Sequence, residues 1–483
     1  MDSKLKIVKY INDPVYGGIP ITQIELDIIS LPIFQRLRGL RQLARVDLVF
    51  PGAEHSRFVH SLGVLYIMGL MANHLFSQGV IDEDDIVKLR VAALLHDIGH
   101  YPLSHLGEAV YGYCKDNNEI VPSIIAELSD NDNKLYELAA SHSKSAHHEY
   151  LGKFIVNNHE GIKSILNKYG LNPNEISEIF TGEIGSKNMV YSQLLHSSLD
   201  ADRLDYLLRD SYQTGVKYGL VDLQYLIRLL MVVEDPNLPN NEKNKVLVCN
   251  KKGQHVVEHF LMSRYFHYSQ IIFHKTNGAF EGLIKAIYTK LILNNGYVYN
   301  SLSEIQEHIN DPEFINFNDA SLETALKEYY RTTNDDEYKA LYRMYVKRIR
   351  PKVVFEIKDL YEEYPQPTFS VLKWKLKREP EQISEIIGSE LWGYQIIPLT
   401  IEKIQNRYPL TERTDEHEEE LREAIKLFNP DTCDISYLAA DNKSVIGHLS
   451  NYKSEFIRIY IYDEKSEIDH NKIRNKINNL IKS

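Results

Sequence analysis

The stretch AALLHDIGHYPLSH, residues 92–105, places His96 and Asp97 side by side at the end of an apolar run. A polar or charged pair is costly to bury unless a group of opposite charge lies against it. Apolar residues at three- and four-residue spacing in IVKLRVAALLHDIG predict a helix before the pair, and Gly99 and Pro102 are expected to end that helix. The stretch therefore indicates a polar site at the end of a buried helix.

Two further stretches carry residues of the same chemical kind. HSRFVHSLG, residues 55–63, holds two histidines, and the second, His60, opens a predicted helix. LLHSSLDADRLDYLLRDSYQTG, residues 194–215, crowds four aspartates onto one leucine-rich helix: Asp200, Asp202, Asp205 and Asp210. Two imidazoles and two carboxylates form a nitrogen and oxygen site suited to iron, manganese, zinc or magnesium. We expect His60, His96, Asp97 and an aspartate of the third stretch to share one divalent ion.

Simpler interpretations exist for each residue taken alone. A single buried histidine such as His60 is more often a hydrogen-bonded core residue than a ligand, and Asp202 could lie on a solvated helix face. The order of the motifs argues otherwise, because H, then HD, then D each fall within an amphipathic helix. In addition, 11 of the 19 histidines lie before residue 200, and most of these fall in three short stretches.

Composition limits the class of protein. The chain has 483 residues, is 43% hydrophobic and carries a formal charge of −12 with a pI near 5.9. This balance lacks the basic stripe typical of proteins that bind nucleic acid backbones. The three cysteines, Cys114, Cys249 and Cys433, are far apart, which predicts neither a disulfide framework nor a thiolate metal site.

The longest apolar stretch, near residues 62–72, is interrupted by Asn73 and His74 and is too short to span a bilayer. The N-terminus shows no apolar core of signal-peptide length. These features predict a cytoplasmic protein without membrane partners.

Periodicity predicts a mainly α fold: a helical core with a small α+β C-terminal region. A hairpin or irregular arm is expected over residues 5–21, and helices are expected from Ile24 to about Tyr218 and again from Gln254 to Leu293. Strands are predicted for the stretches VLVC and EFIRIYIYDE, and a charged helix is predicted for NKIRNKINNLIKS. The expected units are residues 1–300 as the core with its β arm, 301–410 as a helical insertion and 411–483 as the α+β region.

The words HSRFVHSLGV, LLHDIGHYPLSH and DADRLDYLLRD resemble the HD-domain phosphohydrolases. Within that superfamily the chain is similar to the deoxynucleoside triphosphate triphosphohydrolases, in the sterile-alpha-motif and HD-domain branch with its bacterial relatives. The resemblance extends from about Lys9 to Lys275 and includes the stretches INDPVYG, FQRLRGLRQL, FPGAEHSRFVHS and FHK. Because INDP begins at residue 11, we expect a bacterial-type catalytic unit without the sterile-alpha-motif domain.

The resemblance implies a ligand set and a reaction. Its metal ligands fall on four residues: His60, His96, Asp97 and Asp202. In the family, water attacks the α-phosphorus of a dNTP and releases inorganic triphosphate and a deoxynucleoside. The resemblance further implies catalytic roles for His105 as general acid, for Glu108 as the group that holds it, and for His100 and His148.

The resemblance also implies substrate contacts. Arg57, Arg203 and Arg264 match cationic positions on the triphosphate, although the family branch often has lysine where this chain has Arg203. Tyr206 is expected under the ribose ring, where it excludes a 2′-hydroxyl. Asp210 and Gln42 are expected at the 3′-hydroxyl.

Regulation and assembly are implied by resemblance only. The stretches KYINDP and QRLR resemble those that line a nucleotide effector site between subunits in relatives. This resemblance points to Lys9, Arg36 and Arg38. The aspartate that reads guanine in relatives corresponds here to Ser30, so guanine-specific activation is not expected to carry over unchanged. A homo-oligomer, most simply a tetramer, is implied in the same way.

Two other functions fit the same metal motif. An HD phosphodiesterase or nuclease acting on cyclic nucleotides or oligonucleotides would use the same ion and histidines. A nucleotide sensor without turnover would keep the pocket, but the retention of all four ligands and His105 argues against it. The arginines and Tyr206 favour a triphosphate on a deoxy sugar over a diester.

Overall fold

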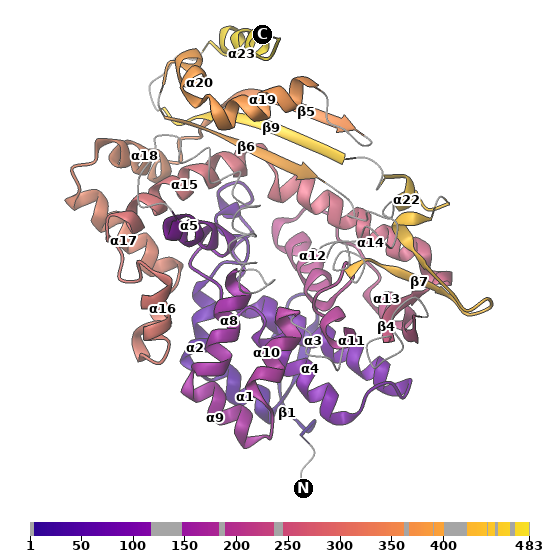
Figure 1. Ribbon diagram of the computed structural model, residues 1–483. Coiled ribbons are helices and arrows are strands. Elements are labelled where there is room, and N and C mark those ends of the chain that lie inside the picture. The colour runs from indigo at the N-terminus through magenta and orange to yellow at the C-terminus, as the bar shows by residue number, and fades with distance from the viewer. Residues whose placement is uncertain are drawn as a thin grey trace.

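A computed structural model describes residues 4–116, 147–182, 189–235, 245–361, 367–389, 391–399, 423–441, 443–449, 453–463 and 469–482. Over these residues the fold is mainly helical, with a helical core and small sheets, which confirms the predicted mainly α fold class. The predicted boundary between residues 410 and 411 lies outside the described residues. Figure 1 shows the helical core in the lower part of the molecule and the C-terminal sheet across its top.

The N-terminal hairpin forms as predicted. Strands β1 (Ile7–Asp13) and β2 (Gly17–Thr22) pair antiparallel. The Asp13 side chain accepts hydrogen bonds from the backbone N–H groups of Val15 (2.9 Å) and Tyr16 (3.1 Å), and Gly17 supplies the positive φ of +75° that the turn needs. Helices α1 (Gln23–Ile29) and α2 (Pro32–Gln35) follow directly.

The core is centred on helix α3 (Arg57–Ser77), whose residues are buried on nearly every side. By length and composition α3 could cross a membrane, but 72% of that apolar window is buried inside the fold, as expected for the core helix of a globular protein. Helices α4 (Glu83–Leu95) and α12 (Ala201–Thr214) pack against it. The other helices of this part of the chain are α5 (His105–Asp116), α8 (His147–Asn158), α9 (Glu160–Lys168), α10 (Pro173–Thr181) and α11 (Met189–Gln193).

The chain then adds a second group of helices beside this core. They are α13 (Leu223–Leu229), α14 (Gln254–His267), α15 (Lys275–Leu293), α16 (Leu302–His308), α17 (Asp319–Thr332) and α18 (Asp336–Val346). The predicted strand VLVC lies in β4 (Lys245–Asn250), which pairs with β3 (Leu230–Glu234) and, in parallel, with β7 (Lys426–Asn429). Strand β8 (Asp434–Tyr437) completes this sheet, and α22 (Val445–Leu449) follows it.

The segment predicted as a helical insertion, residues 301–410, contains two strands besides its helices. Strands β5 (Lys352–Tyr361) and β6 (Trp392–Leu399) lie on either side of β9 (Lys453–Ile461) and pair antiparallel with it. Helices α19 (Pro367–Arg378), α20 (Pro380–Ile387) and α23 (His470–Lys482) pack on this sheet around a separate hydrophobic cluster. The partner strand lies far along the chain, so local periodicity did not reveal the pairing.

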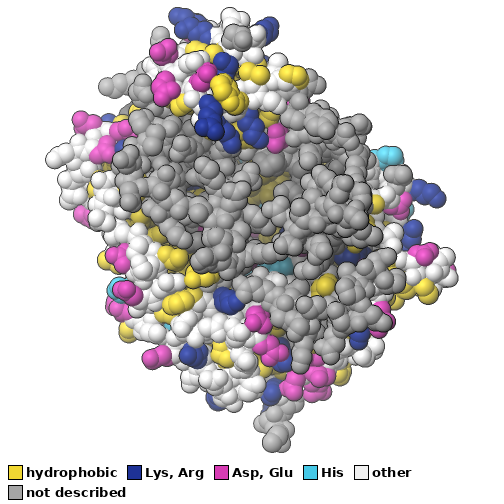
Figure 2. Space-filling view, in the orientation of Figure 1, with side chains coloured by type: hydrophobic (Ala, Val, Ile, Leu, Met, Phe, Trp, Pro, Cys, Tyr) yellow, Lys and Arg dark blue, Asp and Glu magenta, His cyan; other side chains and the backbone are white. Residues whose placement is uncertain are grey.

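Charge is distributed unevenly over the surface. Figure 2 shows lysine and arginine side chains gathered on the upper part of one face, near the C-terminal sheet. In that region α19 carries three lysines and an arginine after its first turn and no acidic residue. The net charge of −12 therefore arises elsewhere in the chain.

Candidate metal centre and cleft

His60 lies in the first turn of α3 and is fully buried. Its Nδ1 atom is 2.7 Å from Oδ2 of Asp205, and its Nε2 atom is 2.9 Å from Oδ1 of Asp202. Both aspartates come from α12, which packs against α3. The ring is thus held on one side by a carboxylate and faces a second carboxylate on the other.

His96 and Asp97 follow the last turn of α4. The Nδ1 atom of His96 hydrogen-bonds to the carbonyl of Ala93 (2.8 Å), which turns Nε2 toward the centre. That Nε2 atom lies 3.4 Å from Oδ1 of Asp97 and 3.9 Å from Oδ1 of Asp202. Nε2 of His60 lies 3.6 Å from Oδ2 of Asp97. The structure therefore brings the four predicted metal ligands together from three segments.

The chemistry of this donor set fits a divalent cation. One ligand atom each from His60, His96 and Asp97 lies within 4.8 Å of the others. The Nε2 atoms of both histidines are buried and make no well-formed hydrogen bond within the described part of the chain. Buried polar atoms without partners are rare unless an ion, a water or a ligand satisfies them. Two imidazoles and two carboxylates suit several first-row metals, so the donor set does not select one.

A buried chain of charges lies behind His60. Arg209 donates to both oxygens of Asp205 (2.9 Å each) and to Oδ2 of Asp13 (2.8 Å). Arg209 is fully buried, and so is Asp205. A Cβ atom at Gly63 of α3 would lie 1.9 Å from Oδ1 of Asp205, so only glycine leaves room for this pair. A second carboxylate that fixes the ring of a ligating histidine is a common feature of metal sites.

The predicted catalytic residues form a second cluster beside the first. Oε2 of Glu108 lies 3.1 Å from Nδ1 of His105 and 3.0 Å from Nδ1 of His148. The His148 ring stacks on His100, with ring centroids 3.9 Å apart. Nε2 of His100 lies 3.1 Å from Oδ1 of Asp97, which joins the two clusters. His105 is the most exposed of the four, with 69% of its side chain accessible.

The carboxylates set the charge state of the imidazoles. Burial lowers the pKa of His60, but the carboxylates of Asp202 and Asp205 beside its two ring nitrogens outweigh it and raise the pKa to about 10. Burial likewise opposes a charge on His148, and the carboxylate of Glu108 raises its pKa to about 9. Burial together with the nearby Arg57 and His148 charges holds the pKa of His100 well below its usual value. His100 is therefore neutral beside a cationic His148.

The loop that carries His105 into the cleft is strained. Leu103 and Ser104 have φ angles of +61° and +55°, in the left-handed region that side chains rarely adopt. Each such residue costs on the order of 1–3 kcal/mol and persists only where the surroundings hold it. The buried Arg57 contributes, because it donates to Ser104 Oγ (3.0 Å) and to Oδ2 of Asp97 (2.8 Å).

Residues of both clusters line a polar cleft of about 220 Å³: His96, Asp97 and Asp202 from the first, and His100, His105 and His148 from the second. Four of the six predicted substrate-binding residues lie in its wall: Gln42, Arg57, Arg203 and Tyr206. Asp200, the N-cap of α12, accepts the backbone N–H of Arg203 (2.7 Å) and pairs with its guanidinium.

The other two predicted contacts lie elsewhere. Both oxygens of Asp210 are occupied, by Nε2 of His55 (2.7 Å) and Nε2 of His267 (2.9 Å), and the residue is buried. Arg264 is half-buried with its guanidinium 5.9 Å from the ring of Tyr268. Neither residue is part of the wall of the cleft.

The three predicted effector residues have different surroundings. Arg36 is buried, 1% exposed, and donates to the carbonyls of Ile98 (2.6 Å), His100 (2.8 Å) and Phe317 (3.0 Å). Lys9 and Arg38 are exposed, and Arg38 lies over the ring of Phe58 at 3.6 Å. Within this chain, Arg36 therefore supports the loop that carries His100.

Sequence reasoning missed several residues of the cleft. His196 and Glu149 lie in its wall with a contact of 3.7 Å between them, and Phe180, Leu195 and Tyr268 line it as well. His196 lies in the same sequence stretch as the aspartates of α12, so its place in the cleft could have been predicted from that position. The place of Glu149 could have been predicted too, since it follows His148 directly. The other three are ordinary apolar or aromatic residues in the sequence.

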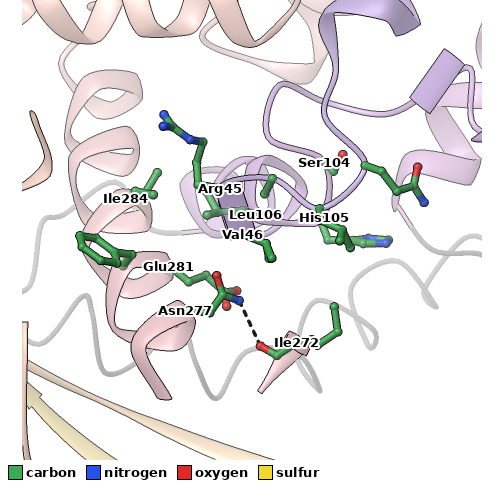
Figure 3. Close-up of a pocket in the computed structure, with 13 residues that line it drawn as sticks. Arg45, Val46, Ser104, His105, Leu106, Ile272, Asn277, Glu281 and Ile284 are labelled. Atoms are coloured by element: carbon green, nitrogen blue, oxygen red, sulfur yellow. Dashed lines mark hydrogen bonds between the residues drawn. The ribbon is translucent and has the colours of Figure 1, made fainter. Parts of the chain in front are cut away.

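A second, mainly apolar cavity of about 130 Å³ adjoins the cleft and shares Gln42 and His105 with it. Figure 3 shows its two sides: Arg45, Val46, Ser104 and Leu106 face a wall formed by Ile272 and the start of α15. Phe280 and Ile284 supply apolar surface on the α15 side, whereas Asn277 and Glu281 supply polar atoms. The polar cleft thus continues into an apolar space.

Comparison with protein families finds an HD domain over residues 57–209. An uncharacterised protein of Bacillus subtilis, YwfO, is 33% identical over 304 residues, which are 62% of this chain and 60% of that protein. Human deoxynucleoside triphosphate triphosphohydrolase SAMHD1 is 30% identical over 257 residues, 48% of this chain and 37% of its own length. The Dictyostelium discoideum homologue of SAMHD1 is 27% identical over 74% of this chain and 61% of its own length.

Solved structures agree with the fold. A phosphohydrolase from Bacteroides thetaiotaomicron matches with a TM-score of 0.60 and 25% identity over 94% of this chain and 99% of its own. A hypothetical protein from Aquifex aeolicus matches with a TM-score of 0.64 and 23% identity over 98% of this chain and all of its own. In each of the three sequence matches above, this chain spans less than two thirds of the relative's length. Together the comparisons support the assignment of this chain to the HD-domain phosphohydrolases.

Proposed function

From the premise that residues 57–209 form an HD domain, we propose that this protein is a metal-dependent dNTP triphosphohydrolase. It would convert a dNTP into a deoxynucleoside and inorganic triphosphate. The observation that carries the proposal is one cleft whose wall contains three of the four metal ligands, the imidazoles of His100, His105 and His148, two arginines and Tyr206. The fourth ligand, His60, lies directly behind Asp202, at 2.9 Å. The similarity to proteins named deoxynucleoside triphosphate triphosphohydrolase supports the same substrate class.

The two cavities match the two ends of a nucleotide. A triphosphate is polyanionic and suits the cleft lined by Arg57 and Arg203. A nucleobase is flat and largely apolar on its faces, and it suits the adjoining cavity, which is mainly apolar. Gln42 borders both spaces, and its buried Oε1 has no hydrogen-bond partner among the described residues. It is therefore available to a substrate hydroxyl.

A divalent cation held by His60, His96, Asp97 and Asp202 would supply Lewis acidity, lowering the pKa of a water molecule and offsetting phosphate charge. The chain's own residues provide the proton transfers. His105 is exposed at the cleft, and Glu108 accepts from its Nδ1–H, so that the protonated imidazole can give its Nε2 proton to a leaving oxygen. Glu108 also holds His148, so both imidazoles have fixed orientations.

Product analysis tests the proposal. We would incubate the purified protein with each dNTP and each NTP in the presence of Mn²⁺ or Mg²⁺ and separate the products by ion chromatography. Inorganic triphosphate with a deoxynucleoside is the expected result. Pyrophosphate, a nucleoside monophosphate or cleavage of a cyclic or oligonucleotide diester would contradict the proposal and favour a phosphodiesterase or nuclease.

Asp202→Ala should abolish metal binding and turnover together, as measured by elemental analysis and initial rate. Asp222→Ala is a matched control, because Asp222 is an exposed helix N-cap and no part of the cleft wall.

Tyr206 tests the sugar preference separately. Its half-buried ring lies in the cleft wall, 5.2 Å from the ring of His267, which limits its movement. Tyr206→Ala should raise the ratio of NTP to dNTP hydrolysis, since the space excluded from a 2′-hydroxyl is then open. An unchanged ratio of kcat/KM values would show that another group selects the sugar.

A further inference from the structure

The start of helix α17 reaches the loops that frame the cleft. Asp319 is the first residue of α17, directly after its N-cap Asn318. One carboxylate oxygen, Oδ1, accepts the backbone N–H of Leu103 at 2.7 Å. The other oxygen, Oδ2, accepts the backbone N–H of Arg41 at 2.9 Å. A single side chain therefore holds two loops that lie more than two hundred residues away along the sequence.

Both hydrogen bonds act next to residues of the cleft. Leu103 is two residues before His105, and Arg41 is directly before Gln42. Ser104 joins the two loops, because its Oγ atom donates to the carbonyl of Arg41 at 2.7 Å. The left-handed conformation of Leu103 is one that the surroundings must maintain. The N–H of Leu103 is the group through which Asp319 maintains it.

The same part of the chain contacts the loop from a second side. Arg36 donates through Nη1 to the carbonyls of both His100 and Phe317. Gly39 also lies close to this segment, since a Cβ atom there would be 2.9 Å from Cβ of Asn318. Residues 317–319 thus offer a carbonyl to the arginine and a carboxylate to the loop N–H groups.

We propose that Asp319 is a positioning residue, which holds His105 and Gln42 at the two edges of the cleft by binding the N–H groups of Leu103 and Arg41. The role in turnover rests on the proposed dNTP triphosphohydrolase activity, whereas the role in loop geometry does not. The start of α17 thereby takes part in the site.

The carboxylate is needed because it accepts two N–H groups at once. Asparagine has one acceptor oxygen and would present its own N–H₂ group to the second loop. In Asp319→Asn, one loop therefore loses its partner and faces a donor. Asn318→Ala is the matched control: it removes the N-cap bond to the backbone N–H of Ser321 (3.1 Å) in the same helix but touches neither loop N–H.

The first experiment is amide hydrogen exchange on the full-length protein. The Leu103 and Arg41 amides should exchange at rates typical of helical amides in the wild type, and at least one of them about tenfold or more faster in Asp319→Asn. In Asn318→Ala the first turn of α17 should exchange faster while both loop amides stay protected. Unchanged protection of both loop amides in Asp319→Asn would overturn the proposal. If Asp319→Asn does not fold, rapid exchange of these amides in the wild type would overturn it.

The second experiment measures kcat and KM for the best dNTP at saturating Mn²⁺. Asp319→Asn should lower kcat about 10- to 100-fold, because a small displacement of a catalytic group is costly. KM should change less than kcat, because Arg203 and Tyr206 are on α12, and of the predicted substrate contacts in the cleft wall only Gln42 follows a loop amide that Asp319 binds. Asn318→Ala should stay within about twofold of wild type in kcat. Equal losses in both variants would show that only helix stability matters, and would contradict the positioning role.

Metal content is measured in every variant and should be unchanged. If the wild-type protein hydrolyses no dNTP, the proposed function fails, and the exchange data still decide whether Asp319 holds the loops.

Discussion

At the scale of single residues, the site depends on buried carboxylates that each serve two partners. Asp205 binds His60 and Arg209, and Glu108 binds His105 and His148. Burial raises the pKa of such carboxyls, but their cationic partners hold the pKa of Glu108 well below its usual range and lower that of Asp205. Asp319 differs, because its two hydrogen bonds come from neutral backbone N–H groups. Burial therefore prevails and raises its pKa from 3.8 to about 6.

This difference predicts a pH dependence of stability. The pKa of Asp319 is higher in the folded than in the unfolded state, so its contribution is most favourable below about pH 4 and is lost as the pH rises through about 6. The free energy of unfolding of the wild type, relative to Asp319→Asn, should fall by at most about 3 kcal/mol between pH 4 and pH 7. Urea unfolding of both proteins at four pH values measures the difference. A difference that does not vary with pH would refute the assigned pKa.

At the scale of elements, the close packing of α3 against α12 permits the buried ion pair behind His60. Gly63 is the position that allows it, because any Cβ atom there would overlap Asp205 and lie 2.4 Å from Nη2 of Arg209. The pair continues to Asp13 at the end of β1, so the N-terminal hairpin is attached to the metal centre through charged groups. The helices and the hairpin thus depend on one another.

Gly63→Ala tests this packing. The added methyl group must displace Asp205 or Arg209, and the resulting disruption should cost about 3 kcal/mol of unfolding free energy. Divalent metal affinity should also fall roughly 10- to 100-fold, because the carboxylate that orients His60 moves. Thermal unfolding and metal titration measure the two effects. Asn73→Ala, on the exposed face of the same helix, should change neither, and a tolerated Gly63→Ala would show that the pair has room to move.

At the scale of the whole molecule, three segments separated by up to 142 positions converge on one point, from His60 to Asp202. A cation bound there would connect α3, the end of α4 and α12. The small sheet of β5, β9 and β6 lies on the other side of α15, where Arg458 donates to the carbonyl of Phe273 (2.6 Å). The C-terminal region is therefore fastened close to the apolar cavity.

Metal removal should destabilise the folded state. A ligand that binds only the folded protein adds about 2.7 kcal/mol at a free concentration one hundred times its Kd. Treatment with a chelator should therefore lower Tm by several degrees, and excess Mn²⁺ should restore it. Asp202→Ala should show no response to either treatment in differential scanning calorimetry. An equal response in that variant would place the stabilising ion elsewhere.

Local sequence alone was sufficient to predict several elements of the fold and the side-chain types of the site. The hairpin, the helices of the core, strand β9 and helix α23 follow from periodicity and turn residues, which act over a few positions. The types of side chain at the site were also visible, because histidine and aspartate stand out in apolar helices. Strands β5 and β6 were missed, since their stability comes from β9 and not from their own residues. Arg36 was assigned by resemblance to a nucleotide effector site between subunits, whereas within this chain the fold surrounds it with carbonyl groups.

The sequence by itself determined which chemical groups are available to the site and which segments of the core are helical, because both depend on residue identity and short-range spacing. Only the tertiary structure decided which partner each aspartate of α12 binds. Asp202 faces the histidines, Asp205 orients one of them, and Asp210 binds two others. These residues differ in direction around the α12 axis, and the neighbours that each direction meets are set by packing against α3 and α14. The role of Asp319 could not be predicted for the same reason. Its partners are backbone N–H groups, and no pattern of side chains in the sequence indicates them.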